Sequence, residues 1–160
     1  MANSVLKPGL RAPAFTLKSD DGGIRRLTAL KGRWVVLYFY PKDMTPGCTA
    51  EACDFRDGLR DFERSGATVM GVSPDGVESH ARFRRQNALN FPLLADRDAK
   101  IAEKYGAWRE KQNYGRKYLG LVRSTFLIDP AGKVAAAWDN VRVKGHTGKV
   151  LARLREEAGR

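Results

Sequence analysis

The sequence predicts an α/β fold in which helices flank a central mixed sheet, with a β-hairpin added at the N-terminus. Strand-like and helix-like segments alternate along the 160 residues, a pattern that favours a sheet with helices on its faces. Residues 34–40 form a continuous run of aromatic and β-branched residues, which is typical of a strand buried on both faces. Two short apolar segments around the Asp-Asp-Gly-Gly sequence of residues 20–23 predict the hairpin.

Local signals mark where the other elements begin and end. Pro41 ends the central strand, and Thr45 and Pro46 fit the N-cap and first position of a helix. We expect strands at residues 15–17, 24–27, 34–40, 68–72, 91–95, 124–130 and 133–138, and helices at residues 46–65, 76–88, 99–105 and 147–158. This order suits a thioredoxin-like sheet in a single domain, residues 1–160, with a basic loop at residues 104–123.

The two cysteines of the chain, Cys48 and Cys53, both belong to the helix after the central strand. Cys48 falls in the opening turn, where unpaired backbone N–H groups and the positive end of the helix dipole face its sulfur. A free thiol has a pKa of about 8.5, and such surroundings lower it, so we expect Cys48 to be a thiolate nucleophile. Cys53 lacks that advantage.

One face of the same helix is apolar, and Cys48 begins it. Apolar residues at positions 52, 55, 59 and 62 continue this face at three- and four-residue spacing, whereas Cys53 lies off it. Five helical positions separate two Cα atoms by roughly 8.7 Å, and a disulfide needs less than about 7 Å. The two sulfurs can therefore join only if the first turns unwind, and Gly58 favours that step by weakening the helix.

Composition fits a small cytoplasmic enzyme. The chain is 42% hydrophobic and 29% charged, as in ordinary globular proteins. We expect neither a membrane span nor secretion, because no apolar stretch is long enough and the N-terminus lacks a signal-peptide pattern. Two cysteines in a reducing compartment are more often catalytic or metal-binding than structural. A four-ligand zinc site is hard to build, since His80 and His146 each stand alone in polar sequence and are expected at the surface.

The sequence Pro41-x-x-x-Thr45-x-x-Cys48 resembles the active-site signature of the peroxiredoxins. The resemblance extends over nearly the whole chain, through residues 9–17, 53–56 and 123–129. It implies a thioredoxin fold that reduces hydrogen peroxide and organic hydroperoxides with a cysteine thiol, without a metal or an organic cofactor.

The cysteine spacing, together with the motifs that begin at Trp108 and Tyr114, looks like the bacterioferritin comigratory protein, or peroxiredoxin Q, subfamily. This resemblance implies a monomer in which Cys48 attacks the peroxide and becomes a sulfenic acid. Cys53 would resolve it as an intramolecular disulfide, which thioredoxin would then reduce.

The resemblance also implies roles for four further residues. Arg123 would keep Cys48 as the thiolate and bind the peroxide oxygens. Thr45 would form a hydrogen bond with the peroxide, Pro41 would shield the pocket from water, and Glu51 would orient Arg123.

Simpler interpretations of the same residues remain open on local sequence. Thr45 could serve only as an N-cap, and Glu51 in a first helical turn could merely complement the dipole. Arg123 is one of 29 basic residues, and Cys48 could be an inert buried thiol. Trp108 and Tyr114 are expected to pack against the body of the protein.

Two other functions compete with the peroxidase. The formal charge of +11 and the aromatic residues of the basic loop would suit a nucleic-acid-binding module, although no nucleic-acid motif is present. A thioredoxin-like disulfide reductase would typically have two residues between its cysteines, whereas four separate Cys48 and Cys53. The spacing therefore favours peroxide chemistry.

Overall fold

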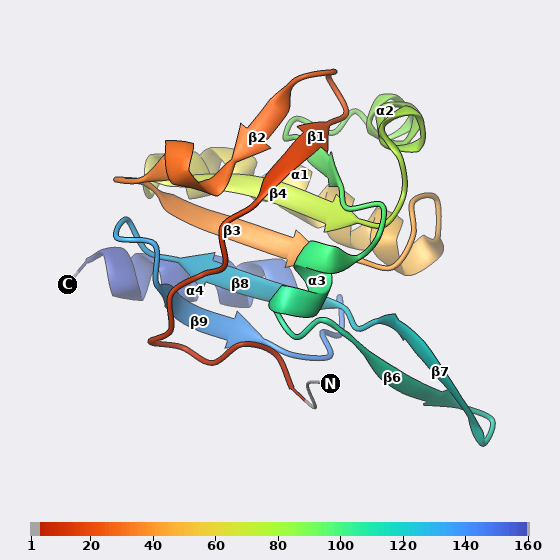
Figure 1. The fold of residues 1–160 in the computed structure, drawn as a ribbon. Helices are drawn as coiled ribbons and strands as arrows, with labels where there is room; N and C mark the ends of the chain where they lie inside the picture. Colours follow the sequence, from red (N-terminus) through yellow and green to blue (C-terminus); the bar gives the residue numbers. More distant parts are fainter. Residues whose placement is uncertain (1–3, 160) are drawn as a thin grey trace.

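The structure of the chain is a computed structural model that describes residues 4–159 (Figure 1). Its strands are β1 (Thr16–Ser19), β2 (Ile24–Arg26), β3 (Trp34–Phe39), β4 (Ala67–Ser73), β5 (Leu93–Ala95), β6 (Trp108–Asn113), β7 (Arg116–Leu121), β8 (Ser124–Ile128) and β9 (Val134–Trp138). Its α-helices are α1 (Pro46–Arg64), α2 (Val77–Gln86), α3 (Lys100–Lys104) and α4 (His146–Ala158), and a short 3-10 helix covers Leu27–Leu30.

Seven strands form one mixed sheet in the order β2-β1-β5-β4-β3-β8-β9. The three central strands β3, β4 and β5 run parallel, and the remaining pairs are antiparallel. Strands β1 and β2 form the N-terminal hairpin at one edge. The predicted mixed α/β architecture is therefore confirmed.

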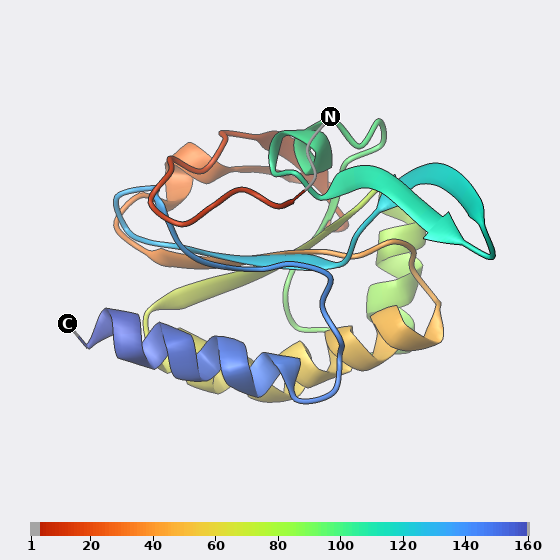
Figure 2. The same ribbon diagram turned by 90° about the horizontal axis from the view of Figure 1, so that it is seen from below.

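The central strand β3 separates two hydrophobic cores. Val36 and Tyr38 point into the core beneath α1, α2 and α4, whereas Leu37 and Phe39 point into the core that α3 and the N-terminal segment cover. Figure 2 shows the sheet edge-on between these two layers. Because both faces are covered, the strand needs apolar residues at every position, as its sequence predicted.

Helix α1 begins directly after the loop that leaves β3. Thr45 is its N-cap residue and Pro46 its first residue, so the predicted helix start is confirmed. The predicted apolar face is also confirmed, because Cys48, Ala52, Phe55, Leu59 and Phe62 are all buried. The helix that carries both cysteines therefore packs against the core from Cys48 to Phe62. No helix among residues 4–159 is long and apolar enough to cross a membrane.

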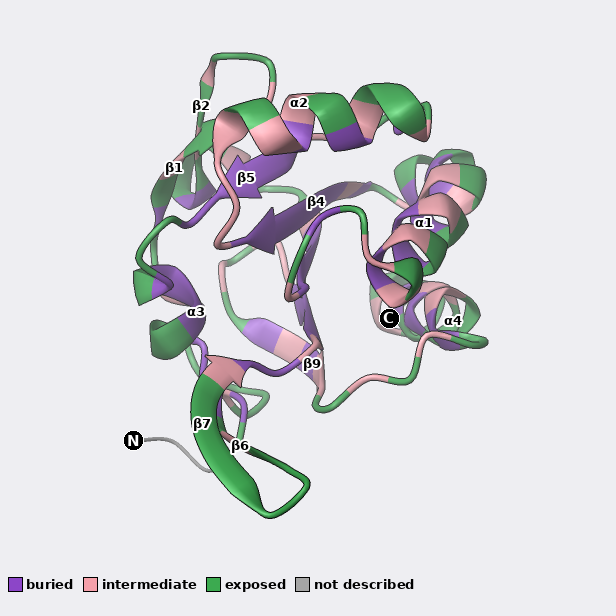
Figure 3. Ribbon diagram, turned by 90° about the vertical axis from the view of Figure 1, so that its right-hand side faces the viewer, coloured by how far each residue is buried: buried purple, intermediate pink, exposed green. Residues whose placement is uncertain are grey.

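The segment predicted as a basic loop is instead a two-stranded hairpin. Strands β6 and β7 pair with each other outside the main sheet, and the hairpin projects from the body of the protein (Figures 1 and 2). Much of its surface is exposed, as the colouring of β7 in Figure 3 shows. Trp108 packs against the core as expected, but Tyr114 at the tip is 100% exposed, so the expectation that it packs was wrong.

The expectation that both histidines lie at the surface was also wrong. His80 is 0% exposed on α2, and His146 is 4% exposed at the start of α4. Each ring meets a polar partner that is distant in sequence, Asp43 for His80 and Thr125 for His146. The polar residues next to each histidine in the sequence suggested a surface position. The partners that allow burial are distant in sequence, and only the tertiary fold brings them to the histidines.

Gly71 in β4 gives a test of the packing beneath α1. A Cβ atom there would lie 2.8 Å from Tyr38 Cζ and 3.0 Å from Leu93 Cδ2. We expect Gly71→Ala to lower the free energy of unfolding by about 1–3 kcal/mol, because it overpacks a filled core. Urea denaturation measures the change.

The matched control is Gly58→Ala in α1, where a Cβ would have its nearest neighbour at 3.6 Å, an ordinary contact. This change should leave stability equal or raise it by up to about 1 kcal/mol, because alanine favours a helix. Equal effects of the two substitutions would contradict the packing argument.

Candidate active site

Cys48 is the third residue of α1, and its side chain is only 1% exposed. Both Cys48 and Cys53 are free thiols. The first turn of a helix leaves backbone N–H groups without intrahelical partners, so Cys48 lies where an anion is stabilised. The predicted position of this residue in the opening turn is confirmed.

Arg123 lies between β7 and β8, and its guanidinium connects two residues of α1. Its Nη2 donates to Cys48 Sγ at 3.3 Å, and its Nη1 donates to Glu51 Oε1 at 2.7 Å. Gly47 allows this approach, since a Cβ there would lie 3.1 Å from Nη2. A planar, permanently charged group thus holds a sulfur and a carboxylate at once. The structure brings together three residues that the sequence indicated separately.

Glu51 is 0% exposed and lies beyond the first turn of α1, so a simple complement to the helix dipole does not describe it. Burial raises the pKa of Glu51 to about 7, and the charge of Arg123 and its hydrogen bond only partly offset this effect. The second oxygen, Oε2, has no hydrogen-bond partner among the residues that the structure describes. The guanidinium of Arg123 therefore contacts two acidic groups, the thiol of Cys48 and the carboxyl of Glu51.

Thr45 and Pro41 border the same loop, and both are partly buried. The hydroxyl of Thr45 donates to the carbonyl oxygen of Lys42 at 2.8 Å and makes no capping bond to the helix. The alternative in which Thr45 acts only as a side-chain cap therefore finds no support. Strand β3 ends at Phe39, one residue earlier than predicted, and Pro41 follows after Tyr40.

Cys53 lies farther along α1 on a partly buried surface, off the apolar face as predicted. Its Sγ is 4.0 Å from Asn87 Oδ1, at the end of α2. The helix is continuous through both cysteines. In this state the two thiols occupy different surroundings, and the separation set by an ideal helix applies to them.

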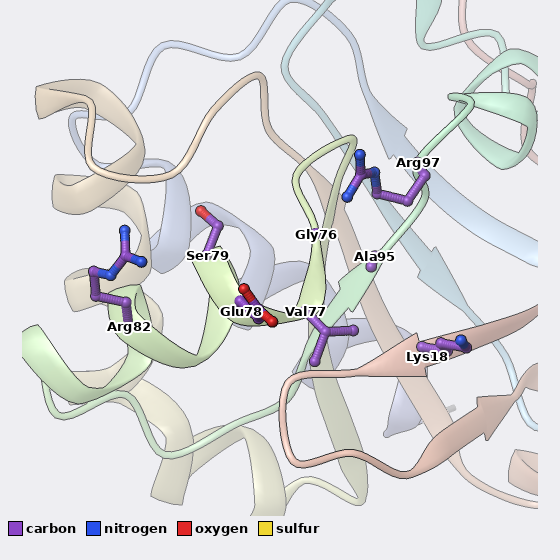
Figure 4. A pocket seen from close by; sticks show the side chains of 8 residues that line it. All are labelled: Lys18, Gly76, Val77, Glu78, Ser79, Arg82, Ala95 and Arg97. Carbon is purple, nitrogen blue, oxygen red and sulfur yellow. The ribbon is translucent and has the colours of Figure 1, made fainter.

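Sequence reasoning missed two residues that border this site. Asp43 is buried between Pro41 and Thr45 and contacts His80, a pair whose members lie 37 positions apart. The sequence signal that could have indicated Asp43 is its position between Pro41 and Thr45, within the active-site pattern. An open depression of the surface lies elsewhere, over the start of α2 beside Lys18 and Arg97 (Figure 4). The thiol itself lies in a nearly closed environment.

Comparison with known proteins places this arrangement in a family. Residues 8–137 match the AhpC/TSA family. Peroxiredoxin Bcp of Bacillus subtilis is 47% identical over 148 residues, which cover 92% of this chain and 94% of that protein. Peroxiredoxin Bcp of Escherichia coli is 42% identical over 153 residues, which cover 96% of this chain and 98% of that protein.

A solved structure agrees with these matches. Peroxiredoxin Q of Xanthomonas campestris superposes with a TM-score of 0.90 at 42% identity, covering 94% of this chain and 98% of that one. The thioredoxin-like peroxiredoxin fold is thereby confirmed. With a cysteine at a helix start, an arginine on its sulfur and these relatives, the chain belongs to the peroxiredoxins, the cysteine-dependent peroxidases, in the branch of bacterioferritin comigratory protein and peroxiredoxin Q.

Proposed function

We propose that Cys48 of this chain reduces hydrogen peroxide and organic hydroperoxides as the peroxidatic thiolate. The observation that carries the proposal is the 3.3 Å contact between Arg123 Nη2 and Cys48 Sγ at the start of α1. A structure of the related Xanthomonas campestris bacterioferritin comigratory protein, 42% identical, is described as giving insights into alkyl peroxide reduction. That description supports organic hydroperoxides as substrates here.

The first step is attack of the Cys48 thiolate on the terminal oxygen of the hydroperoxide. A sulfur–oxygen bond forms and the oxygen–oxygen bond breaks, so Cys48 becomes a sulfenic acid and the leaving alkoxide takes up a proton to give an alcohol, or water from hydrogen peroxide. Arg123 stabilises the charge that moves along the peroxide oxygens. Thr45 hydrogen-bonds to the peroxide, Pro41 excludes water and Glu51 orients the guanidinium.

The second step is attack of the Cys53 sulfur on the sulfenic sulfur. The disulfide bond forms, the sulfur–oxygen bond breaks and water leaves. Because α1 is continuous from Pro46 to Arg64, its first turns must unwind before the sulfurs meet. Gly58 favours this step, because glycine is a poorer helix former than alanine. Packing does not require glycine there, since a Cβ atom would make only ordinary contacts.

Reduction of the disulfide by an external dithiol completes the cycle, and we assign this role to thioredoxin. The competing assignment, a disulfide reductase, finds no support in the buried position of Cys48, because a reductase must bring its attacking sulfur to a protein disulfide. A nucleic-acid-binding role has only the exposed basic β6–β7 hairpin in its favour.

Cysteine variants test the two thiol roles. Cys48→Ser should abolish peroxide consumption, whereas Cys53→Ser should form one sulfenic acid per chain and then stop turning over with thioredoxin. The measurements are peroxide loss coupled to thioredoxin and its reductase, and the intact mass of the oxidised protein. Full turnover by the Cys53 variant would remove its resolving role. Efficient reduction of insulin disulfides by the native chain, without peroxide consumption, would favour a reductase instead.

Arg123→Met tests the electrostatic role of the guanidinium. Losing one preorganised charged donor should slow the oxidation of Cys48 by about a hundredfold or more. Stopped-flow tryptophan fluorescence follows this single step. The control is Arg84→Met, which removes the arginine of another ion pair, formed by Arg84 of α2 with Asp20 and involving no residue of α1. An unchanged rate in the Arg123 variant would contradict the proposed role.

Glu51→Gln tests the buried carboxyl through the pH dependence of stability. Between about pH 4.5 and about pH 7 the folded protein holds a proton on Glu51 that the unfolded chain has lost. The contribution of Glu51 to the free energy of unfolding is therefore full below this window and falls as the pH rises through it. Urea unfolding across the window should show the native chain losing stability relative to the glutamine variant, and the opposite slope would contradict the assignment.

A further inference from the structure

A buried polar cluster ties the loop before α1 to helix α2. At its centre is Asp43, which is 3% exposed. Its carboxylate accepts hydrogen bonds from Tyr40 Oη at 2.6 Å and from Ser79 Oγ at 2.8 Å, and it lies 2.7 Å from His80 Nδ1. Ser79 belongs to the start of α2 (Figure 4). We call these four residues the Asp43 cluster, and none of them has a part in the chemistry described above.

His80 contacts an acceptor with each of its ring nitrogens. Its Nε2 lies 2.9 Å from the carbonyl oxygen of Leu94, which can only accept, so Nε2 carries a hydrogen. Its Nδ1 faces the Asp43 carboxylate, which already accepts from two hydroxyl groups. Burial alone would raise the pKa of Asp43, but the bonds from His80, Tyr40 and Ser79 outweigh burial and lower it. The two ring nitrogens of His80 therefore contact two acceptors, the Asp43 carboxylate and the Leu94 carbonyl oxygen, so that Asp43 and His80 form a buried pair.

The backbone of the loop is held as firmly as the Asp43 side chain. The N–H group of Asp43 donates to Asp75 Oδ2 at 2.6 Å, and Ser73 Oγ donates to the same oxygen. The next residue, Met44, has a φ of 69°, in the left-handed region of backbone conformation that residues other than glycine rarely adopt. Such a conformation persists only where its surroundings overdetermine it. The cluster therefore holds a strained residue directly before the helix N-cap, Thr45.

We propose that Asp43 and His80 are positioning residues, whose buried 2.7 Å contact holds Thr45 and Cys48 in the peroxide-reactive arrangement and sets how readily the start of α1 unwinds. This inference rests on the proposed peroxidase function. Release of the loop would let Met44 relax and would free the first turn of α1. Loosening the pair should thus slow the attack on peroxide, which needs the folded site, and speed disulfide formation, which needs the unwound helix.

Single-turnover kinetics of Asp43→Asn test this opposition. We expect oxidation of Cys48 by hydrogen peroxide to slow by about tenfold, because a displaced catalytic loop loses alignment. Formation of the disulfide with Cys53 should become faster in the same protein. A smaller fraction of chains should also reach the irreversible sulfinic acid at high peroxide, as measured by intact mass. A merely structural defect would not raise one rate while lowering the other.

The matched control is Asp20→Asn, which removes a carboxylate whose side chain is 3% exposed and which pairs with Arg84 of the same helix α2 and accepts from the N–H group of Leu93. Both rates should be unchanged in this control. His80→Gln should reproduce the Asp43 effect, and Ser79→Ala, which removes one hydrogen bond from the same carboxylate, should shift both rates in the same directions by less. The Ser79 variant keeps the test decisive if the Asp43 and His80 variants fail to fold.

Two outcomes would overturn the inference. One is a fall of both rates together in the Asp43, His80 and Ser79 variants. The other is agreement of these variants with the Asp20 control. Failure of the peroxidase assignment would look different, because the native chain itself would then leave Cys48 unoxidised by peroxide.

Discussion

The site depends on one guanidinium that reaches two residues of the same helix. Arg123 contacts Cys48 through one nitrogen and Glu51 through another, and only its fixed planar geometry allows both contacts at once. Burial makes these interactions strong, since little water competes for the charges. It also makes them costly to rearrange. The buried thiol of Cys48 and the guanidinium beside it suit the proposed attack on a peroxide, in which negative charge moves only from the sulfur to the neighbouring peroxide oxygens.

The rest of the fold serves to bring that arginine to that helix. Strand β3 delivers the chain to the start of α1, and its neighbour β8 begins directly after Arg123. Gly47 leaves room for the guanidinium, and Gly71 leaves room for the Tyr38 ring beneath α1. Close approaches of this kind need the absence of a side chain, which explains glycine at two positions with ordinary backbone geometry.

The proposed disulfide step requires the site to come apart, and the structure shows which contacts resist that change. Helix α1 packs along its apolar face from Cys48 to Phe62, and its N-cap residue Thr45 closely follows Asp43 in the loop that contacts α2. Reactivity toward peroxide and disulfide formation thus make opposite demands on the same few residues. A loop held by a small number of buried polar contacts meets both demands, because such contacts are strong while intact and are lost together.

The sequence predicted those parts of the fold that rest on local patterns. The apolar run of β3, the N-cap and proline at the start of α1, and the apolar face that begins at Cys48 were all confirmed, because each follows from periodicity or backbone preference. The β6–β7 hairpin escaped prediction for the same reason. Strands with both faces largely exposed need no alternation of polar and apolar residues, so their sequence resembles a loop.

By itself, the sequence determined which sulfur starts the helix and which kind of chemistry its motifs resemble. The tertiary structure alone decided that Arg123, 75 residues away, would contact that sulfur, and that the polar His80 would be buried against Asp43. The reason is physical. Helix starts and apolar faces are properties of neighbouring residues, whereas a buried charge finds its partner only when distant strands and helices have packed and water has been excluded.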